Sequence, residues 1–354
     1  MKNVVKAFLK GFVLKVIPLW LYKHLVPGKL TSIFYHAVSD DSLPHIHNIY
    51  PVVNSQQFRG AIEYLLKRYK YVSYEEIEAG YEKGVSLPQN SVHLTFDDGF
   101  IECFSVIRPI LLEYGIPATF FITTDFIGNK VLFTANLKSL LIEKVNKMDS
   151  TEFIRVKKKV EDHFNIGIES IEGLLNLINR IDRRDEKGWS IISDSFGFDS
   201  TAYLKDKPLY LNKEQIKKMK SEGFTIGAHS RSHFKLGLVD DKLMEEEIVE
   251  STKFIKKITG QKSIPFSFPN SGYGVDREKL KQIRKDNPEL GLLFDSKGFN
   301  HDAAFIINRI WGEHPSFIRD DNKHKMQKII HSAYQEAFFL KLSSIFQRSK
   351  TKAS

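Results

Sequence analysis

The sequence predicts an α/β fold built on a mainly parallel sheet, which is either open or closed into a barrel. Short runs of β-forming residues recur along the chain, and helical patterns lie between several of them, which is the alternation expected of parallel sheets. The chain has 354 residues, of which 42% are hydrophobic and 12% aromatic, so it can bury a substantial core. This composition excludes global disorder and allows one large domain with an insertion, or two modest domains.

Each expected element follows from its local pattern. Strands are predicted at residues 30–35, 92–96, 118–122, 224–227, 264–268 and 291–294. Helices are predicted at 56–69, 104–114 and 242–258. The last of these helices has Asp240 or Asp241 as its N-cap and Gly260 as its stop signal.

Three segments depart from this alternation. Residues 130–210 contain two or three charged helical patterns, at 137–148, 151–164 and 170–184, and no strand pattern. We interpret them as a helical insertion in a main domain that covers residues 28–320. Residues 1–27 predict a basic amphipathic helix, because apolar residues recur at helical spacing with lysines mostly on the other side. Residues 321–354 predict a basic helical tail.

The net charge of +9 favours an anionic partner. A nucleic acid is not expected, because zinc-finger spacing, a basic zipper and an aromatic RNA-binding signature are all absent. Peripheral contact of the N-terminal helix with a membrane is the more specific expectation. The alternatives are a helix that packs on its own domain and an ordinary solvated basic surface.

The N-terminal segment also bears on location. Lys10 and Lys15 interrupt its apolar stretch, so it matches neither a transmembrane span nor a secretory signal. We therefore expect a cytoplasmic or membrane-associated protein, with an extracytoplasmic location as the alternative.

The first chemical motif is Asp97-Asp98-Gly99, at the end of an expected strand. Parallel α/β sheets collect active-site residues at the carboxyl ends of their strands. Two adjacent carboxylates raise each other's pKa unless a cation is present, and a divalent metal would relieve that repulsion. One aspartate could then bind the metal while the other acts as a general base. By itself, however, Asp-Asp-Gly is also a common turn.

The second motif is the pair His229 and His233, which follows another expected strand. Histidines at i and i+4 face the same way on a helical turn and can share one metal. Ser230 follows the first histidine, so the zinc-protease helix motif is absent. Cys103 is the only cysteine, so a metal must be held by histidines and carboxylates. With Asp98, the pair forms a two-His, one-carboxylate set that suits zinc, and also cobalt, nickel or iron.

Together these motifs resemble those of the polysaccharide deacetylases, the chitooligosaccharide-deacetylase homology group. Thr-Phe-Asp-Asp-Gly at 95–99 and His-Ser-Arg-Ser-His at 229–233 are similar to the family's first two motifs. Gly-Ile-Pro-Ala-Thr-Phe-Phe at 115–121 is similar to the strand after the first motif, and the resemblance covers residues 30 to 315 or so. It implies a distorted (β/α) barrel with a helical insertion. It also implies a general base and the ligands of a divalent metal, zinc first with cobalt or nickel as alternatives: Asp97 as the base, and Asp98, His229 and His233 as the ligands.

A third match is Phe34-Tyr35-His36, at the end of the first expected strand. It resembles the subgroup of poly-N-acetylglucosamine deacetylases, in which an early Tyr-His pair supplies the catalytic histidine. The resemblance implies that His36 is the general acid that protonates the leaving amine. The structural alternative is a histidine that makes a local hydrogen bond at a strand end. The late Leu-x-Ile-His motif of other family members is not found.

The third family motif is altered. Where the family has Arg-x-Pro-Tyr/Phe-Gly, residues 266–272 read Phe-Ser-Phe-Pro-Asn-Ser-Gly, without the arginine that would orient Asp97. Arg309 stands where related sequences carry a late arginine and is the candidate replacement. A backbone N–H near Asn270, together with the metal, would stabilise the oxyanion. The late motif with paired Asp and Trp is not recognised, which leaves the glycan contacts at that wall undefined.

The expected function is hydrolysis of an N-acetyl group, or alternatively an O-acetyl group, on a sugar of an acetylated glycan or glycan precursor. The altered third motif raises a non-enzyme alternative, a catalytically degenerate, membrane-associated glycan-binding protein on the same fold. A non-haem iron oxygenase also uses two His and one carboxylate, but usually with a His and an acid close together before a distant His. The intact ligand set and base favour the hydrolase.

Overall fold

The structure is a computed structural model that describes residues 18–26, 28, 30–300, 302–318 and 325–351. Its centre is a sheet of parallel strands. Within the described residues the strands are β1 (Thr31–Tyr35), β2 (Lys70–Tyr71), β3 (Ser91–Phe96), β4 (Ala118–Ile122), β5 (Thr225–Ala228), β6 (Ile264–Ser267), β7 (Leu290–Asp295) and β8 (Ile306–Trp311).

The sheet closes into a barrel. The strand order is β1-β8-β7-β6-β5-β4-β3-β2, and β1 also pairs with β3, so that seven strands form the barrel and β2 lies outside β3. The barrel is distorted at β5 and β6, which share the single pair Ala228 with Phe266. The register also shifts between β6 and β7, from Ile264 to Phe266. The predicted distorted (β/α) barrel is therefore confirmed.

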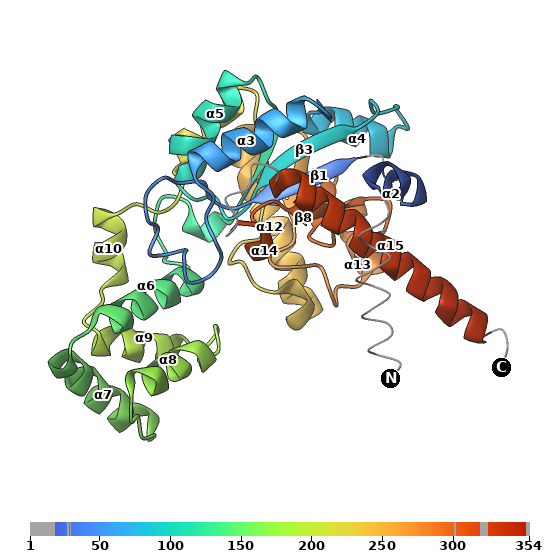
Figure 1. The fold of residues 1–354 in the computed structure, drawn as a ribbon. Helices are drawn as coiled ribbons and strands as arrows, with labels where there is room; N and C mark the ends of the chain where they lie inside the picture. The colour runs from blue at the N-terminus through green and yellow to red at the C-terminus, as the bar shows by residue number, and fades with distance from the viewer. Residues whose placement is uncertain (1–17, 27, 29, 301, 319–324, 352–354) are drawn as a thin grey trace.

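Helices surround the barrel (Figure 1). Those of the main domain are α3 (Ser55–Leu66), α4 (Tyr74–Glu82), η1 (Cys103–Ile107), α5 (Arg108–Glu113), η2 (Thr124–Phe126), α11 (Lys213–Ser221), η3 (Leu236–Leu238), α12 (Asp241–Thr259), α13 (Arg277–Asp286) and α14 (Pro315–Ile318). The predicted ends of α12 are confirmed. The Asp240 side chain accepts from the Leu243 N–H at 2.9 Å, and Gly260 ends the helix with a φ of 68°.

All six predicted strands are present, but two strands were missed. β2 has two residues, which are too few to show the apolar run or alternation that predicts a strand. β8 reads Ile-Ile-Asn-Arg-Ile-Trp, and the polar pair Asn308 and Arg309 interrupts its apolar run. A buried arginine is tolerated there only because a carboxylate pairs with it, and that partner is distant in the sequence.

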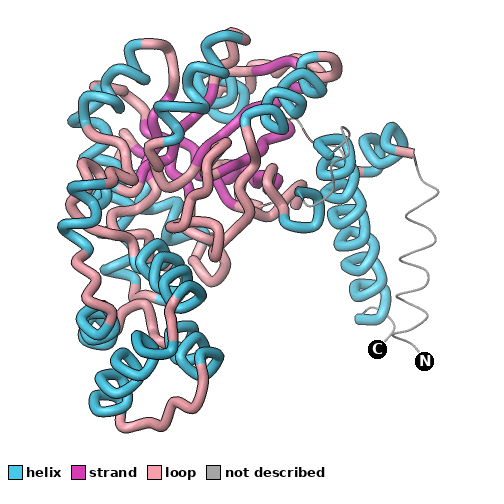
Figure 2. Tube along the Cα trace, turned by 60° about the vertical axis from the view of Figure 1, so that its left-hand side comes forward, coloured by secondary structure: helices cyan, strands magenta, loops and turns pink. Residues whose placement is uncertain are grey.

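The predicted helical insertion is a lobe beside the barrel (Figures 1 and 2). Its described residues form α6 (Thr134–Lys147), α7 (Ser150–Phe164), α8 (Ile171–Arg180), α9 (Glu186–Ser195) and α10 (Ser200–Asp206), so the expectation of two or three helices was wrong. The predicted helix at 170–184 ends early because Asp182 to Asp185 form a turn, in which Asp185 caps α9. The lobe has its own apolar core, which includes Leu141, Val156 and Ile192.

The two ends of the described chain lie side by side. α2 (Leu19–Leu25) packs against α15 (Lys325–Thr351), which projects away from the barrel (Figures 1 and 2). Tyr22 makes edge-on ring contacts with His331 and Phe338. Most of the predicted amphipathic helix at 1–27 lies outside the described residues, so its membrane contact stays a prediction. Within the described part of the chain, each helix lacks either the length or the apolarity to cross a bilayer.

Candidate active site

The candidate residues gather at one rim of the barrel. His36 follows β1, Asp97 and Asp98 follow β3, and His229 follows β5. Because the strands are parallel, their carboxyl ends meet at this rim. A cleft of about 990 Å³ opens there. It is lined by all seven predicted site residues: His36, Asp97, Asp98, His229, His233, Asn270 and Arg309.

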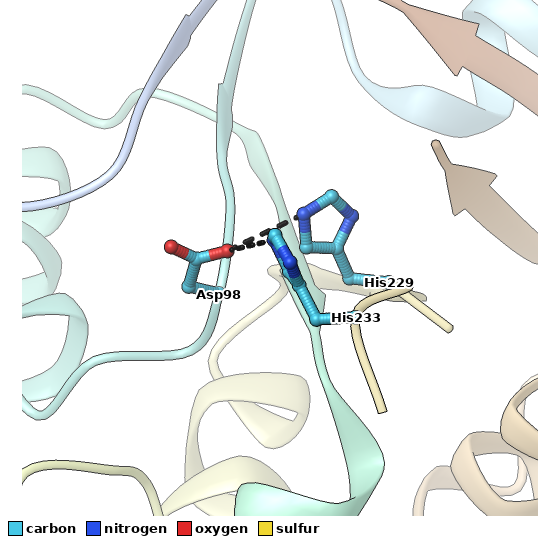
Figure 3. Close-up of side chains that lie close together, drawn as sticks. All are labelled: Asp98, His229 and His233. Atoms are coloured by element: carbon cyan, nitrogen blue, oxygen red, sulfur yellow. Dashed lines mark ion pairs between the residues drawn. The ribbon is translucent and has the colours of Figure 1, made fainter. Parts of the chain in front are cut away.

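Three of these residues form a buried cluster that can hold a metal. Asp98 Oδ1 lies 3.3 Å from His229 Nε2 and 3.1 Å from His233 Nε2 (Figure 3). The ligand atoms of the three residues lie within 4.8 Å of one another. His229 Nδ1 donates to the Ser267 carbonyl oxygen at 2.9 Å, which leaves its Nε2 as the atom for a ligand. Asp98 Oδ1 is buried without a hydrogen-bond partner. A divalent cation would satisfy this oxygen and both imidazoles, so the residues fit the predicted metal.

The backbone of the site is strained. Asp98, Ser230, His233 and Asn270 have φ values of 71°, 60°, 65° and 61°, in the left-handed region that non-glycine residues rarely adopt. The predicted helical turn for the two histidines is therefore wrong. Residues 229–234 form an irregular loop, and the positive φ angles within it let both imidazoles reach the same carboxylate.

Asp97 is held by Arg309 of β8. Arg309 Nη1 donates to Asp97 Oδ1 and Nη2 to Oδ2, both at 2.7 Å. The guanidinium is 1% exposed and also donates to Thr95 Oγ1 and Ser267 Oγ, at 2.9 and 2.6 Å. Burial by itself raises the pKa of Asp97, but the charge of Arg309, helped by His229, outweighs it and lowers the pKa. Arg309 thus makes the contact expected of the missing third-motif arginine.

His36 is paired with a buried glutamate. Glu313 Oε1 contacts His36 Nδ1 and also accepts from the His36 backbone N–H at 3.1 Å. Burial by itself lowers the pKa of His36, but the charge of Glu313, helped by Asp98 and Asp97, raises it to about 9. The imidazole is therefore protonated at neutral pH. With Nδ1 engaged, Nε2 is the nitrogen that can protonate a substrate in the cleft.

Sequence reasoning missed Glu313. It lies two residues after Trp311, which lines the cleft and donates from Nε1 to Glu313 Oε1 at 3.4 Å. The late motif was expected to pair an aspartate with a tryptophan, so a glutamate in this place was passed over. An acid just after the strand that carries the late arginine is the signal that could have found it.

Tyr50 was also missed. It lies in the loop between β1 and α3, where its ring stacks on His36 with centroids 4.2 Å apart. Its hydroxyl donates to Asp98 Oδ2 at 3.2 Å. The residue therefore links the histidine to the carboxylate of the cluster. No motif in its own segment could have indicated this.

Asn270 also lines the cleft. Its carbonyl oxygen accepts from Ser296 Oγ at 2.8 Å, and the neighbouring Gly272 N–H donates to buried Asp295 at 2.9 Å. These contacts hold the loop of the altered third motif at the rim. Whether its backbone stabilises an oxyanion stays a prediction.

Glu313→Gln is expected to move the alkaline limb of the pH–rate profile to lower pH. Glutamine keeps the shape but removes the charge that raises the pKa of His36, and one opposite charge is worth about 1–3 pKa units. If His36 must be protonated to act, kcat/KM falls at a pH lower by that amount. The profile is measured from acetate release. An unchanged alkaline limb, with the protein folded, would remove His36 from the role of acid.

A closed parallel barrel with a carboxylate–imidazole cluster and two further charge pairs at its carboxyl rim has the layout of a barrel enzyme. A profile of the polysaccharide deacetylase family matches residues 84–287, more than half of the chain. The chain belongs to the polysaccharide deacetylase family, which confirms the resemblance seen in its motifs.

Individual relatives agree with this assignment. The chain is 25% identical over 176 residues to the poly-beta-1,6-N-acetyl-D-glucosamine N-deacetylase of Staphylococcus epidermidis, with 49% of this chain and 54% of that protein covered. The chain spans about half the length of the curated relatives it matches.

Two solved structures share the fold. The Streptococcus pyogenes deacetylase PplD in complex with acetate has a TM-score of 0.53 at 18% identity, covering 86% of this chain and 99% of that one. IcaB from Ammonifex degensii has a TM-score of 0.51 at 16% identity, covering 87% of this chain and 97% of that one. At these identities the likeness shows the fold alone.

Proposed function

We propose that this protein is a metal-dependent deacetylase that hydrolyses N-acetyl groups, or alternatively O-acetyl groups, on a sugar of a glycan or glycan precursor. The observation that carries the proposal is the different environment of the two adjacent aspartates. Asp97 is paired with Arg309, whereas Asp98 faces His229 and His233. Two adjacent aspartates need such different surroundings if one is to act as a base and the other as a metal ligand.

The proposed metal is zinc, with cobalt or nickel as alternatives, held by Asp98, His229 and His233. When bound, it would polarise the acetyl carbonyl and lower the pKa of a water at the site. The buried oxygen of Asp98, which has no hydrogen-bond partner, and the Nε2 atoms of both histidines that face it support this assignment.

The chain's own residues would carry the proton transfers. Asp97 takes a proton from the attacking water as the new C–O bond forms on the acetyl carbon. A backbone N–H near Asn270 donates to the developing oxyanion. His36 gives its proton to the amine nitrogen as the C–N bond breaks, which releases acetate and a free amine.

The shape of the cleft supports a sugar substrate. Its walls include the aromatic rings of Phe34, Phe268 and Trp311 close to the catalytic groups, and flat apolar rings suit the faces of sugars. A cleft of about 990 Å³ exceeds what one sugar needs. The named activity of the Staphylococcus epidermidis relative adds N-acetylglucosamine polymers as the first substrates to test. Nothing in the site favours the degenerate binding protein.

Metal removal should abolish the activity. We expect acetate release from β-1,6-linked N-acetylglucosamine oligomers, its loss in chelator, and its return on adding zinc, because the acetyl carbonyl is unreactive without a Lewis acid. His229→Ala should show the same loss without recovery. Acetate is measured across a panel of N- and O-acetylated glycans. Activity that persists in chelator would contradict the metal; a folded, zinc-loaded protein inactive on the whole panel would contradict the function.

A further inference from the structure

Two residues of the helical insertion that belong to no motif contact His233. Phe133 directly precedes α6, and its ring centroid lies 4.7 Å from that of His233. Arg183 lies in the turn between α8 and α9. Its Nη1 donates to the carbonyl oxygen of His233 and its Nη2 to that of Ser232. Both Phe133 and Arg183 line the cleft.

Arg183 is held firmly although it lacks an acidic partner. Its guanidinium lies 4.6 Å from the ring of Phe133 and 5.3 Å from that of Phe234, within cation–π range. Burial lowers its pKa to about 10, so it stays protonated at neutral pH. Among the residues described, none of the ion pairs includes Arg183. Its two carbonyl contacts are therefore its main polar interactions.

The same loop is also held by Glu247 of α12, which is fully buried. The glutamate accepts from the backbone N–H groups of Arg231 and Ser232, at 2.9 and 2.8 Å, and from Ser232 Oγ at 2.6 Å. Glu247 thus binds the N–H groups of the loop while Arg183 binds its C=O groups. Strained backbone, such as that of His233, persists only where its surroundings hold it in this way.

The two histidines differ in what orients them. His229 Nδ1 donates to the Ser267 carbonyl, which fixes the ring. His233 Nδ1 is buried and has no hydrogen-bond partner. Its orientation therefore depends on its backbone and on the ring of Phe133. The backbone N–H of His233 donates to Ser230 Oγ at 2.8 Å within the loop, and its carbonyl oxygen accepts from Arg183. Of these supports, Arg183 and Phe133 come from the insertion.

We propose that Arg183 is a positioning residue for the metal ligand His233, so that the helical insertion completes the metal site of the barrel. The inference rests on the proposed function for its metal, but it concerns binding of that metal and not turnover. A loop freed from Arg183 would sample other conformations, and the metal would have to select the competent one.

The test is the affinity of the metal-stripped protein for zinc, measured by competition with a chromogenic chelator. Arg183→Ala is expected to bind zinc about 10–100-fold more weakly, as for other residues that orient a metal ligand. Arg184→Ala is the matched control, because Arg184 is the next residue of the same turn, lines the same cleft and forms an ion pair with exposed Asp182. Its zinc affinity should stay that of the parent.

Arg183→Lys adds a conservative variant. Lysine keeps the charge, but one ammonium group cannot reproduce a planar fork on two carbonyl oxygens, so an intermediate affinity is expected. A merely structural role would lower the melting temperature of the metal-free protein and leave the zinc affinity unchanged.

Parental zinc affinity in folded Arg183→Ala would overturn the proposal. If that variant does not fold, parental affinity in Arg183→Lys would overturn it equally. A parent that binds zinc but releases no acetate contradicts the proposed function. The role of Arg183 can still be tested in that case, because the test measures zinc affinity. A parent that binds neither zinc, cobalt nor nickel overturns both.

Discussion

Arg309→Met is expected to remove nearly all deacetylase turnover and to lower the free energy of unfolding by about 3–5 kcal/mol, the range for breaking one side of a buried ion pair. Methionine fills much of the arginine volume but leaves Asp97 buried without its cation. Burial then raises the pKa of Asp97, and a protonated carboxyl cannot act as a base. Turnover should fall by about 10²–10⁴-fold, the contribution of a general base. Urea unfolding and acetate release are the two measurements.

Arg108→Met is the control for the loss of an arginine fork. Arg108 makes a two-pronged contact with Glu222, but this pair is partly exposed and does not line the cleft. Its loss should therefore cost less stability than loss of the fully buried Arg309–Asp97 pair, and turnover should not change. The double variant Arg309→Met with Asp97→Asn should be less destabilised than the sum of its parts, because the uncompensated charge is gone. Parental turnover in folded Arg309→Met would show that Asp97 needs no partner.

The barrel and the Asp98–His229–His233 cluster were predictable because their signals are local. Each strand shows its apolar run within a few residues, and parallel strands bring their carboxyl ends to one rim whatever the connections between them. Asp98, His229 and His233 follow their strands directly, so their meeting required only the correct topology. The conformation of the histidine loop was not predictable, because spacing alone cannot distinguish a helical turn from a strained loop.

The partners of the catalytic groups were harder to predict because they are distant in sequence. Glu313 is 277 residues from His36, and Arg309 is 212 residues from Asp97. Arg309 was proposed only through the resemblance. The strand that carries Arg309, β8, was missed because an arginine is buried in a strand only where a carboxylate pairs with it, and that carboxylate is distant in sequence. Arg183 lies in a segment that resembles nothing in the motifs. Contacts of this kind follow from the closed fold and leave no pattern in their own segments.

Asp97→Asn is expected to lower turnover by about 10²–10⁴-fold while zinc binding stays close to that of the parent. The amide has almost the shape of the carboxylate but cannot take a proton from water at neutral pH. Metal binding should survive because Asp98, His229 and His233 are untouched. The amide also leaves Arg309 buried without an anion, so some stability is lost. Acetate release, zinc competition and urea unfolding are measured on the same preparation.

Asp98→Asn is the matched comparison, the same change one residue along the chain. It removes the charged oxygen that faces both histidines, so zinc affinity and turnover should both fall. Arg309 keeps its partner in this variant, which leaves one buried pair intact. The two isosteric changes therefore separate the roles of the adjacent aspartates: one loses turnover with zinc bound, the other loses zinc. Equal loss of zinc in both variants would assign Asp97 to the metal as well, and near-parental turnover in Asp97→Asn would remove it as the base.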